Sequence, residues 1–198
     1  MYTFLMEYLF KYLETLYHVE PRLKEYLAHI LKTKRYLKER FLLKQGTVCN
    51  MVWFLSEGLT RWFSDRDDKG ITTWFVPAGE AVMEPASFYD QLPSLVSIVA
   101  VEDCETIYAE YKDIMDLYER FPDTLFMGRK IADKHAKDMS AHSYALLQSH
   151  AEERYAYLLK HHGYLIGRVP VNYLASFINM DLSTFYRAKN EWMHKQLR

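Results

Sequence analysis

Residues 36–111 consist of short apolar stretches at regular spacing, and this pattern restricts the fold more than any other feature of the chain. The stretches are rich in β-branched and aromatic residues, as β-strands are. The turn clusters that separate them include Glu57-Gly58, "DRDDKG" and Pro77-Ala78-Gly79. Short strands joined by hairpin turns pair with their neighbours in the chain. We therefore expect an antiparallel sandwich or barrel of about eight strands.

Helical periodicity flanks this region on both sides. From Tyr2 to about Lys34 apolar residues recur at helical spacing, and Pro21 fits the first turn of a second helix. After Pro122 a stripe of apolar or small residues predicts one long helix. The members of the stripe are Leu125, Ile131, Ala132, Ala136, Met139, Ser143, Leu146 and Leu147. A stripe of this length can pair with its copy in a second subunit, so we expect a homodimer.

The sequence of the C-terminal region predicts a capped helix followed by a helix-turn-helix. Ser149, three residues before Glu152, predicts a capping box at the start of a helix. The stretch "VPVNYLASFINMDLSTFYRAKNEW" then predicts a helix-turn-helix, in which Asn179 breaks the first helix and Asp181 caps the second. The inward residues of the two helices are expected to be Leu174, Ala175 and Ile178, and Phe185, Ala188 and Trp192.

Charge is distributed unevenly along a chain whose formal net charge is −1. Residues 1–128 contain 14 Lys and Arg against 20 Asp and Glu, whereas residues 129–198 contain 11 against 6. Six of the eight histidines also lie in the second part. A basic segment on an acidic body favours a polyanion as the partner of the C-terminal third.

This order of parts resembles the Crp/Fnr superfamily of bacterial transcription regulators over nearly the whole chain. The segments that carry the resemblance are "LLKQGTVCNMVWFLSEGLTRWF", "GITTWFVPAGE", "AEERYAYLL" and "VPVNYLASFINMDLSTFYR". The resemblance implies an α+β fold: an antiparallel β-roll or jelly-roll barrel with flanking helices, a long dimerisation helix and a C-terminal, winged-helix-like helix-turn-helix domain. The expected divisions are a cyclic-nucleotide-binding-like sensor domain at residues 1–121, the dimerisation helix at 122–148 and the DNA-binding domain at 149–198.

The pocket that the resemblance implies lacks the groups that hold a cyclic phosphate. In family members that bind cyclic AMP, a Gly-Glu pair begins a short helix, and an Arg followed by Ser or Thr holds the phosphate. Glu84 can take the place of the acid, but Met83 stands where the family has glycine. Ser94 and Leu95 stand where the family has the Arg and its polar neighbour. A buried anion without its Arg forfeits a charge-assisted interaction of about 1.5–3 kcal/mol.

We therefore expect this pocket to bind neither a cyclic nucleotide nor another cofactor. Two alternatives remain open: the protein's own Met and aromatic side chains fill the pocket, or it holds another small ligand. The candidate pocket residues are Gly79, Glu80, Met83, Glu84, Ser94 and Leu95.

The resemblance implies that the second helix of the helix-turn-helix enters the major groove of double-stranded DNA. The residues expected to reach the bases are Ser183, Thr184, Tyr186, Arg187 and Asn190. The residues expected to lie toward phosphates are Asp181, Lys189 and the helix entry at Pro170, Asn172 and Tyr173. Many family members carry Arg-Glu at the positions of Leu182 and Ser183, so the operator, an inverted repeat, is expected to differ from theirs. The resemblance also implies RNA polymerase as a partner.

Other classes of protein find little support in the sequence. Residues 30–134 contain no histidine, and no Walker or Gly-x-Ser-x-Gly motif is present, so we expect neither a metal site nor an enzyme. Cys49 and Cys104 are expected to be free, partly buried thiols. No apolar run approaches the roughly 20 residues that span a bilayer, so we expect a soluble, cytoplasmic protein without a membrane partner.

Histidines and tryptophans are expected to have structural roles. His161 and His162 follow Lys160 at a helix end, where cations suit the helix dipole. His135 and His142, seven positions apart, are expected on a solvated helix face, with contact across a dimer as the alternative. The tryptophans at positions 53, 62 and 74 are expected to line the core or a pocket.

One alternative from another class stays open. The same fold can serve as a ligand-sensing or protein-interaction module whose terminus does not bind DNA. The chain ends at Arg198, soon after the recognition helix, so wing strands are expected to be short or absent.

Overall fold

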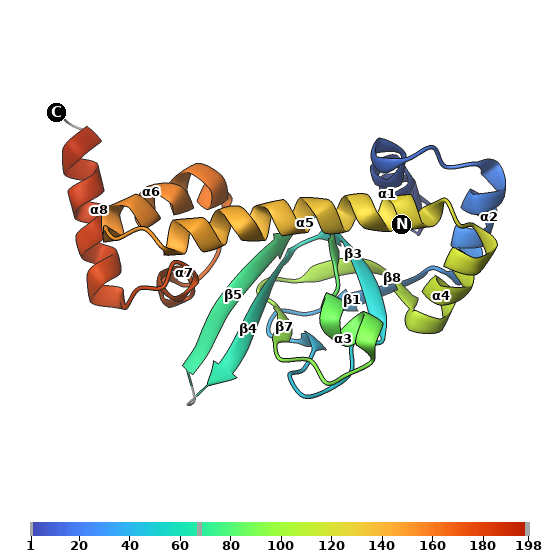
Figure 1. Ribbon diagram of the computed structural model, residues 1–198, viewed down its shortest axis with the longest axis horizontal. Coiled ribbons are helices and arrows are strands. Elements are labelled where there is room, and N and C mark those ends of the chain that lie inside the picture. Colours follow the sequence, from blue (N-terminus) through green and yellow to red (C-terminus); the bar gives the residue numbers. More distant parts are fainter. Residues whose placement is uncertain (1, 67–68, 197–198) are drawn as a thin grey trace.

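The chain folds into two antiparallel sheets with helices at both ends, as Figure 1 shows for a computed structural model that describes residues 2–66 and 69–196. One sheet has the strand order β1-β8-β3-β6 and the other β2-β7-β4-β5. The first sheet consists of β1 (Lys32–Tyr36), β8 (Cys104–Glu110), β3 (Met51–Glu57) and β6 (Glu80–Val82). The second consists of β2 (Phe41–Leu43), β7 (Ser97–Ala100), β4 (Leu59–Arg66) and β5 (Lys69–Pro77). The expected α+β class is confirmed.

The chain passes from one sheet to the other at Gly58, between β3 and β4. Its φ angle is +101°, which glycine adopts far more readily than other residues. A Cβ atom here would lie 2.6 Å from the backbone oxygen of Asp103. Both observations explain why the turn that the sequence predicts at this position requires glycine.

The core between the sheets is aromatic. The side chains of Trp53, Trp62 and Trp74 are buried, which confirms that these residues line the core or a pocket. The indole nitrogen of Trp53 donates a hydrogen bond to the hydroxyl of Tyr36 over 3.1 Å, so this polar group is satisfied inside the core. Cys49 and Cys104 are buried free thiols in the same cluster, as expected.

The long helix α5 runs along the middle of the molecule, beside the strands, in Figure 1. The first two helices and α4 gather at one end of it, and the last three helices form the other end. The N-terminal group is α1 (Tyr2–Leu16), α2 (Pro21–Ile30) and α4 (Tyr111–Arg120), and α3 (Pro85–Asp90) lies beside the sheets. The rest are α5 (Thr124–Leu146), α6 (Ala151–His162), a 3₁₀ turn (Gly163–Leu165), α7 (Val171–Phe177) and α8 (Leu182–Gln196).

Two local expectations were wrong, and one helix was missed. The helical pattern that we extended to Lys34 ends at Ile30, because the next residue is already extended and β1 begins at Lys32. Helix α4 was not predicted. The capping box at Ser149 does not form, since α6 begins at Ala151 and its cap position is held by His150 without a side-chain hydrogen bond.

Candidate functional site

The turn between α7 and α8 has the geometry that the sequence predicts. Asn179 has a φ angle of +53°, in the left-handed region that asparagine tolerates. The carboxylate of Asp181 accepts hydrogen bonds from the backbone nitrogen of Thr184 (2.7 Å) and the hydroxyl of Ser183 (2.7 Å). These hydrogen bonds lower the pKa of Asp181 to about 2, so the cap is ionised at neutral pH. The inward residues Phe185 and Ala188 are buried.

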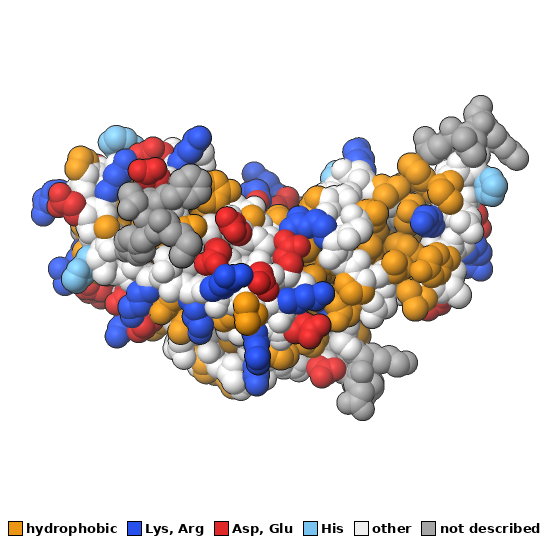
Figure 2. All heavy atoms as spheres, turned by 180° about the vertical axis from the view of Figure 1, so that it is seen from behind, with side chains coloured by type: hydrophobic (Ala, Val, Ile, Leu, Met, Phe, Trp, Pro, Cys, Tyr) orange, Lys and Arg blue, Asp and Glu red, His pale blue; other side chains and the backbone are white. Residues whose placement is uncertain are grey.

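Helix α8 presents both polar and apolar side chains to solvent. Ser183, Arg187 and Asn190 are exposed, whereas Thr184 and Lys189 are half-buried. The apolar side chains of α8 that are also exposed are Leu182 (46%), Tyr186 (49%) and Met193 (41%). Figure 2 shows hydrophobic side chains gathered over the part of the molecule that carries the C-terminal helices.

The entry to α7 contacts strands of the second sheet. Pro170 and Asn172 are exposed, but the ring of Tyr173 lies 3.8 Å from the guanidinium carbon of Arg61. Arg61 is buried and donates to the hydroxyl of Thr72 (2.8 Å) and the backbone oxygen of Gly70 (2.5 Å). A second link joins the backbone nitrogen of Thr72 to the hydroxyl of Ser176 over 2.9 Å. The β4–β5 hairpin therefore holds α7 in place.

An aromatic cluster that the sequence did not reveal forms the centre of this contact. Phe177 of α7 is fully buried, and its ring stacks on that of His142 with 4.2 Å between centroids. Trp74, Phe75 and His162 meet the same ring at 5.9, 5.3 and 5.1 Å. Strand β5, helix α5 and the C-terminal helices thus share one core. His142 lies in it and not on the solvated face that we expected.

Burial also changes the charge of the two histidines in this cluster. Burial lowers the pKa of His142 to about 4. Burial, together with repulsion from His142 and His161, also lowers the pKa of His162 to about 4. Both rings are therefore neutral at pH 7. His162 does not serve as a cationic cap, whereas His161 remains exposed beside the ring of Tyr157.

Two of the six residues predicted to line a cyclic-nucleotide-type pocket form local hydrogen bonds, and a third is exposed. Glu84 caps α3 by accepting a hydrogen bond from the backbone nitrogen of Ser87 over 2.6 Å. Ser94 is buried, and its hydroxyl donates to the backbone oxygen of Val96 over 2.8 Å. The side chain of Leu95 is 79% exposed. None of these three lines either cavity described below.

The remaining three candidates lie in β6 or next to it in the chain. Gly79 occupies the turn between β5 and β6 with a φ angle of +89°. Glu80 forms an ion pair with Lys134 of α5, and Met83 is half-buried. Glu80 and Met83 each line a cavity, but not the same one.

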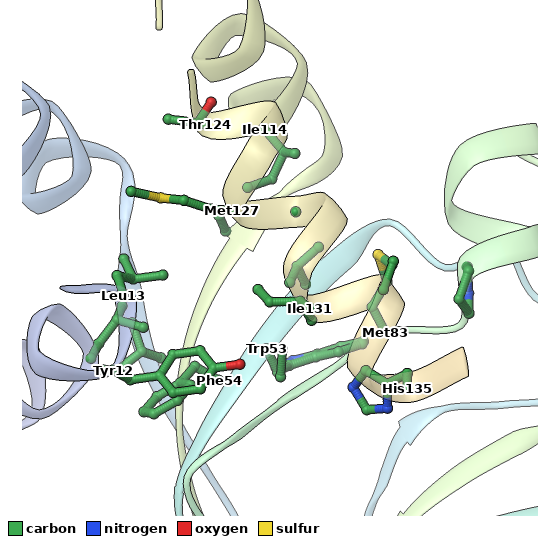
Figure 3. Close-up of a pocket in the computed structure, with 18 of the residues that line it drawn as sticks. Tyr12, Leu13, Trp53, Phe54, Met83, Ile114, Thr124, Met127, Ile131 and His135 are labelled. Atoms are coloured by element: carbon green, nitrogen blue, oxygen red, sulfur yellow. The ribbon is translucent and has the colours of Figure 1, made fainter. Parts of the chain in front are cut away.

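The larger cavity has a volume of about 370 Å³ and lies between the N-terminal helices, the first sheet, α4 and α5 (Figure 3). Nearly all of its lining is apolar, and it includes three tryptophans and Met83. The polar exceptions are Tyr12, Tyr89, Tyr118, Thr124 and His135. Sequence reasoning missed this cavity because its walls come from ten helices and strands that are spread along the chain.

A second cavity of about 230 Å³ lies between β5, α5 and α6. Glu80, Lys134, Asp138 and three histidines contribute to its wall, so it is more polar. No cluster of His, Cys, Asp and Glu able to hold a metal ion occurs within residues 2–66 and 69–196. Over the same residues, no helix combines the length and apolar character needed to cross a bilayer.

Comparison with known proteins identifies the fold. Residues 33–121 match the family model of the cyclic nucleotide-binding domain. No curated protein sequence matches the chain. Among solved structures, the c-di-GMP responsive global regulator CLP of Xanthomonas campestris aligns with a TM-score of 0.68 at 16% identity, covering 87% of this chain and 91% of that one.

Two further solved structures agree with this result. A CooA mutant from Carboxydothermus hydrogenoformans aligns with a TM-score of 0.68 at 16% identity, covering 84% of this chain and 78% of that one. The catabolite activator protein of Thermus thermophilus gives 0.56 at 19% identity, with 91% and 87% covered. The fold expected from the resemblance to Crp/Fnr regulators is confirmed: residues 33–121 match the cyclic nucleotide-binding domain, and the chain shares the fold of these solved structures.

Proposed function

We propose that the chain is a DNA-binding transcription regulator that acts as a homodimer on an inverted-repeat operator. The observation that carries the proposal is the α7–α8 pair, with its left-handed turn at Asn179, its cap at Asp181 and the exposed Arg187 on α8. The excess of basic residues in positions 129–198 supports a polyanionic partner. Such a regulator works in the cytoplasm, recruits or blocks RNA polymerase and is not an enzyme.

Arg187 provides the sharpest test of DNA binding. It is exposed on α8, six residues after the cap, and an arginine there can grip a guanine edge with two hydrogen bonds. Replacement by alanine is expected to weaken binding to the preferred site by about 1–3 kcal/mol and to relax selection at one base position per half-site. Selection from a random DNA library at low and moderate salt, followed by sequencing, measures both effects.

Lys189 serves as the matched control on the same helix. It is half-buried and predicted to face phosphates, so Lys189→Ala should weaken binding to all sequences about equally and make the salt slope shallower by about one unit. If the parent protein selects no sequence and Arg187→Ala binds all DNA as well as the parent does, the DNA-binding proposal is wrong.

The exposed face of α5 supports the homodimer. Leu125, Ala132, Met139 and Leu146 follow one another at intervals of seven residues, the spacing of a coiled-coil seam. Leu125 is 52% exposed, Met139 44% and the neighbouring Leu147 80%. An apolar stripe exposed along 23 residues of helix favours burial against a second copy.

Met139→Glu is expected to dissociate the homodimer, because two carboxylates would meet at the centre of the seam. Multi-angle light scattering at micromolar concentration should give the mass of a dimer for the parent and of a monomer for the variant. Lys137→Glu, at an exposed position outside the stripe, is the control and should remain dimeric. A monomeric parent protein would contradict the proposal.

Protein contact is the second candidate function. Exposed Leu182, Tyr186 and Met193 lie on the face of α8 that a DNA reader would turn to the major groove. Apolar side chains at this place favour a protein partner over a phosphate backbone. The library selection described above separates the two functions, since a protein-interaction module would enrich no DNA sequence.

The cyclic-nucleotide pocket of this domain is proposed to be inactive. Its phosphate-binding Arg is replaced by Ser94, whose hydroxyl is already engaged, and Glu84 caps α3. A cyclic phosphate would therefore find no counter-charge there.

A further inference from the structure

The outward surface of α8 consists of two parallel rows of side chains. Successive residues of an α-helix are offset by about 100°, so the three members of each row fall within about 40° of one another around the helix axis. One row is Leu182, Tyr186 and Met193, and the other is Ser183, Arg187 and His194. All six side chains are exposed. The surface of α8 that points away from the core is therefore apolar along one side and polar along the other.

The charge around the apolar row indicates what kind of molecule this surface fits. Helix α8 contains three Lys and Arg residues and one acidic residue, Glu191. Figure 1 places α8 at the outer end of the molecule, where a large partner can reach it. Double-stranded DNA combines negative phosphates with an apolar group, the C5 methyl of thymine, in its major groove. The charge and the methyl groups of DNA complement the two rows of α8.

The first residue of α8 is the apolar Leu182, directly after the cap at Asp181. In a helix-turn-helix, the N-terminal residues of the second helix contact the base edges. The hydroxyls of Ser183 and Thr184 both donate to the Asp181 carboxylate, so they are engaged in the cap. The side chain of leucine has neither donor nor acceptor, so it cannot read the polar groups of a base. The group in the major groove that it complements is the methyl of thymine.

Leu182 and Tyr186 are one helical turn apart, which is about 6 Å along the helix axis. Neighbouring base pairs are about 3.4 Å apart along the DNA axis, so the two side chains can contact bases about two steps apart. We propose that Leu182 and Tyr186 each bind the methyl group of a thymine in the half-site, beside the base that Arg187 contacts. The inference rests on the proposed DNA-binding function and specifies which operators that function selects.

Replacing thymine by deoxyuridine tests the inference, because it removes the C5 methyl and keeps every hydrogen-bonding group of the base. The full chain first selects its preferred site from the random DNA library, and each thymine of that site is then replaced in turn. Fluorescence anisotropy titration is expected to show two positions per half-site at which the replacement weakens binding about fourfold, the loss for one buried methyl. A site at which no replacement changes the affinity would overturn the inference.

Two variants assign the methyl groups to their side chains. Leu182→Ala should make one of the two positions insensitive to deoxyuridine, and Tyr186→Ala should do so for the other. Both side chains are about half exposed, so neither substitution should affect folding. Leu37→Ala is the matched control: this leucine is exposed to a similar degree between β1 and β2, so the variant should keep the parent's response at both positions.

The outcomes separate this inference from the proposed function. If the parent protein selects no DNA sequence, the proposed function is wrong, and the apolar row of α8 is left for a protein partner. If the parent selects a site but Leu182→Ala and Tyr186→Ala respond to deoxyuridine as the parent does, DNA binding stands and the thymine contacts are wrong. Loss of methyl sensitivity at a separate position in each variant supports both.

Discussion

Phe177→Ala is expected to destabilise the C-terminal helices by about 3–5 kcal/mol, among the largest effects that one substitution can have on this chain. The phenyl ring is 1% exposed and contacts rings from β5, α5 and the end of α6. Its removal leaves a cavity among side chains that belong to three distant segments. These segments cannot all close in on the space, since each is held by its own hydrogen bonds.

Urea denaturation followed by circular dichroism and tryptophan emission measures the effect. Trp74 contacts Phe177 directly, so its emission reports on the contact between β5 and α7. Tyr186→Ala on exposed α8 is the control and is expected to change stability by no more than about 0.5 kcal/mol. A Phe177→Ala variant as stable as this control would show that the aromatic cluster does not hold the C-terminal helices.

The parts of the fold with strong local signals could be predicted from the sequence. Alternating strands, the turn at Gly58 and the cap at Asp181 each depend on residues close together in the chain. Helix α4 was missed because we extended the strand pattern to its first residue, Tyr111, and saw no helical signal before Pro122. Strand β1 was missed because four of its five residues are exposed, so it lacks the alternation of a half-buried strand.

Long-range contacts explain what could not be predicted of the candidate site. His142 lies on a long polar helix and looks solvated in sequence, but α7 covers it with Phe177, 35 positions further along the chain. The large cavity has the same origin, because Leu27 and Met127, 100 positions apart in the chain, belong to one hydrophobic cluster in its wall. The roles of the predicted DNA-binding and pocket residues, and the predicted domain boundaries, stay predictions.

The stability of the protein is expected to fall steeply between pH 6.5 and pH 4. His142 and His162 are 6% and 8% exposed, and their pKa values are lowered from 6.5 to about 4 in the folded chain. In this pH range the unfolded chain binds protons that the folded chain does not, so acid favours unfolding. Above pH 6.5 the two histidines do not reduce the free energy of unfolding. Below pH 6.5 each histidine lowers it by about 1.4 kcal/mol per pH unit, until the folded pKa of that histidine is reached.

Chemical denaturation at pH 7, 6, 5 and 4.5 tests this expectation. His142→Phe should reduce the loss of stability at low pH by the contribution of one histidine, because a phenyl ring can stack on Phe177 without taking up a proton. Asn190→Ala, an exposed substitution on α8 that removes no titratable group, is the control and should leave the slope unchanged. Asp181 loses its charge only near pH 2, well below this window. A parent protein equally stable at pH 7 and pH 4.5 would mean that the two rings are not buried as neutral groups, and the contact between β5, α5 and α7 would then have to be more open than the aromatic cluster implies.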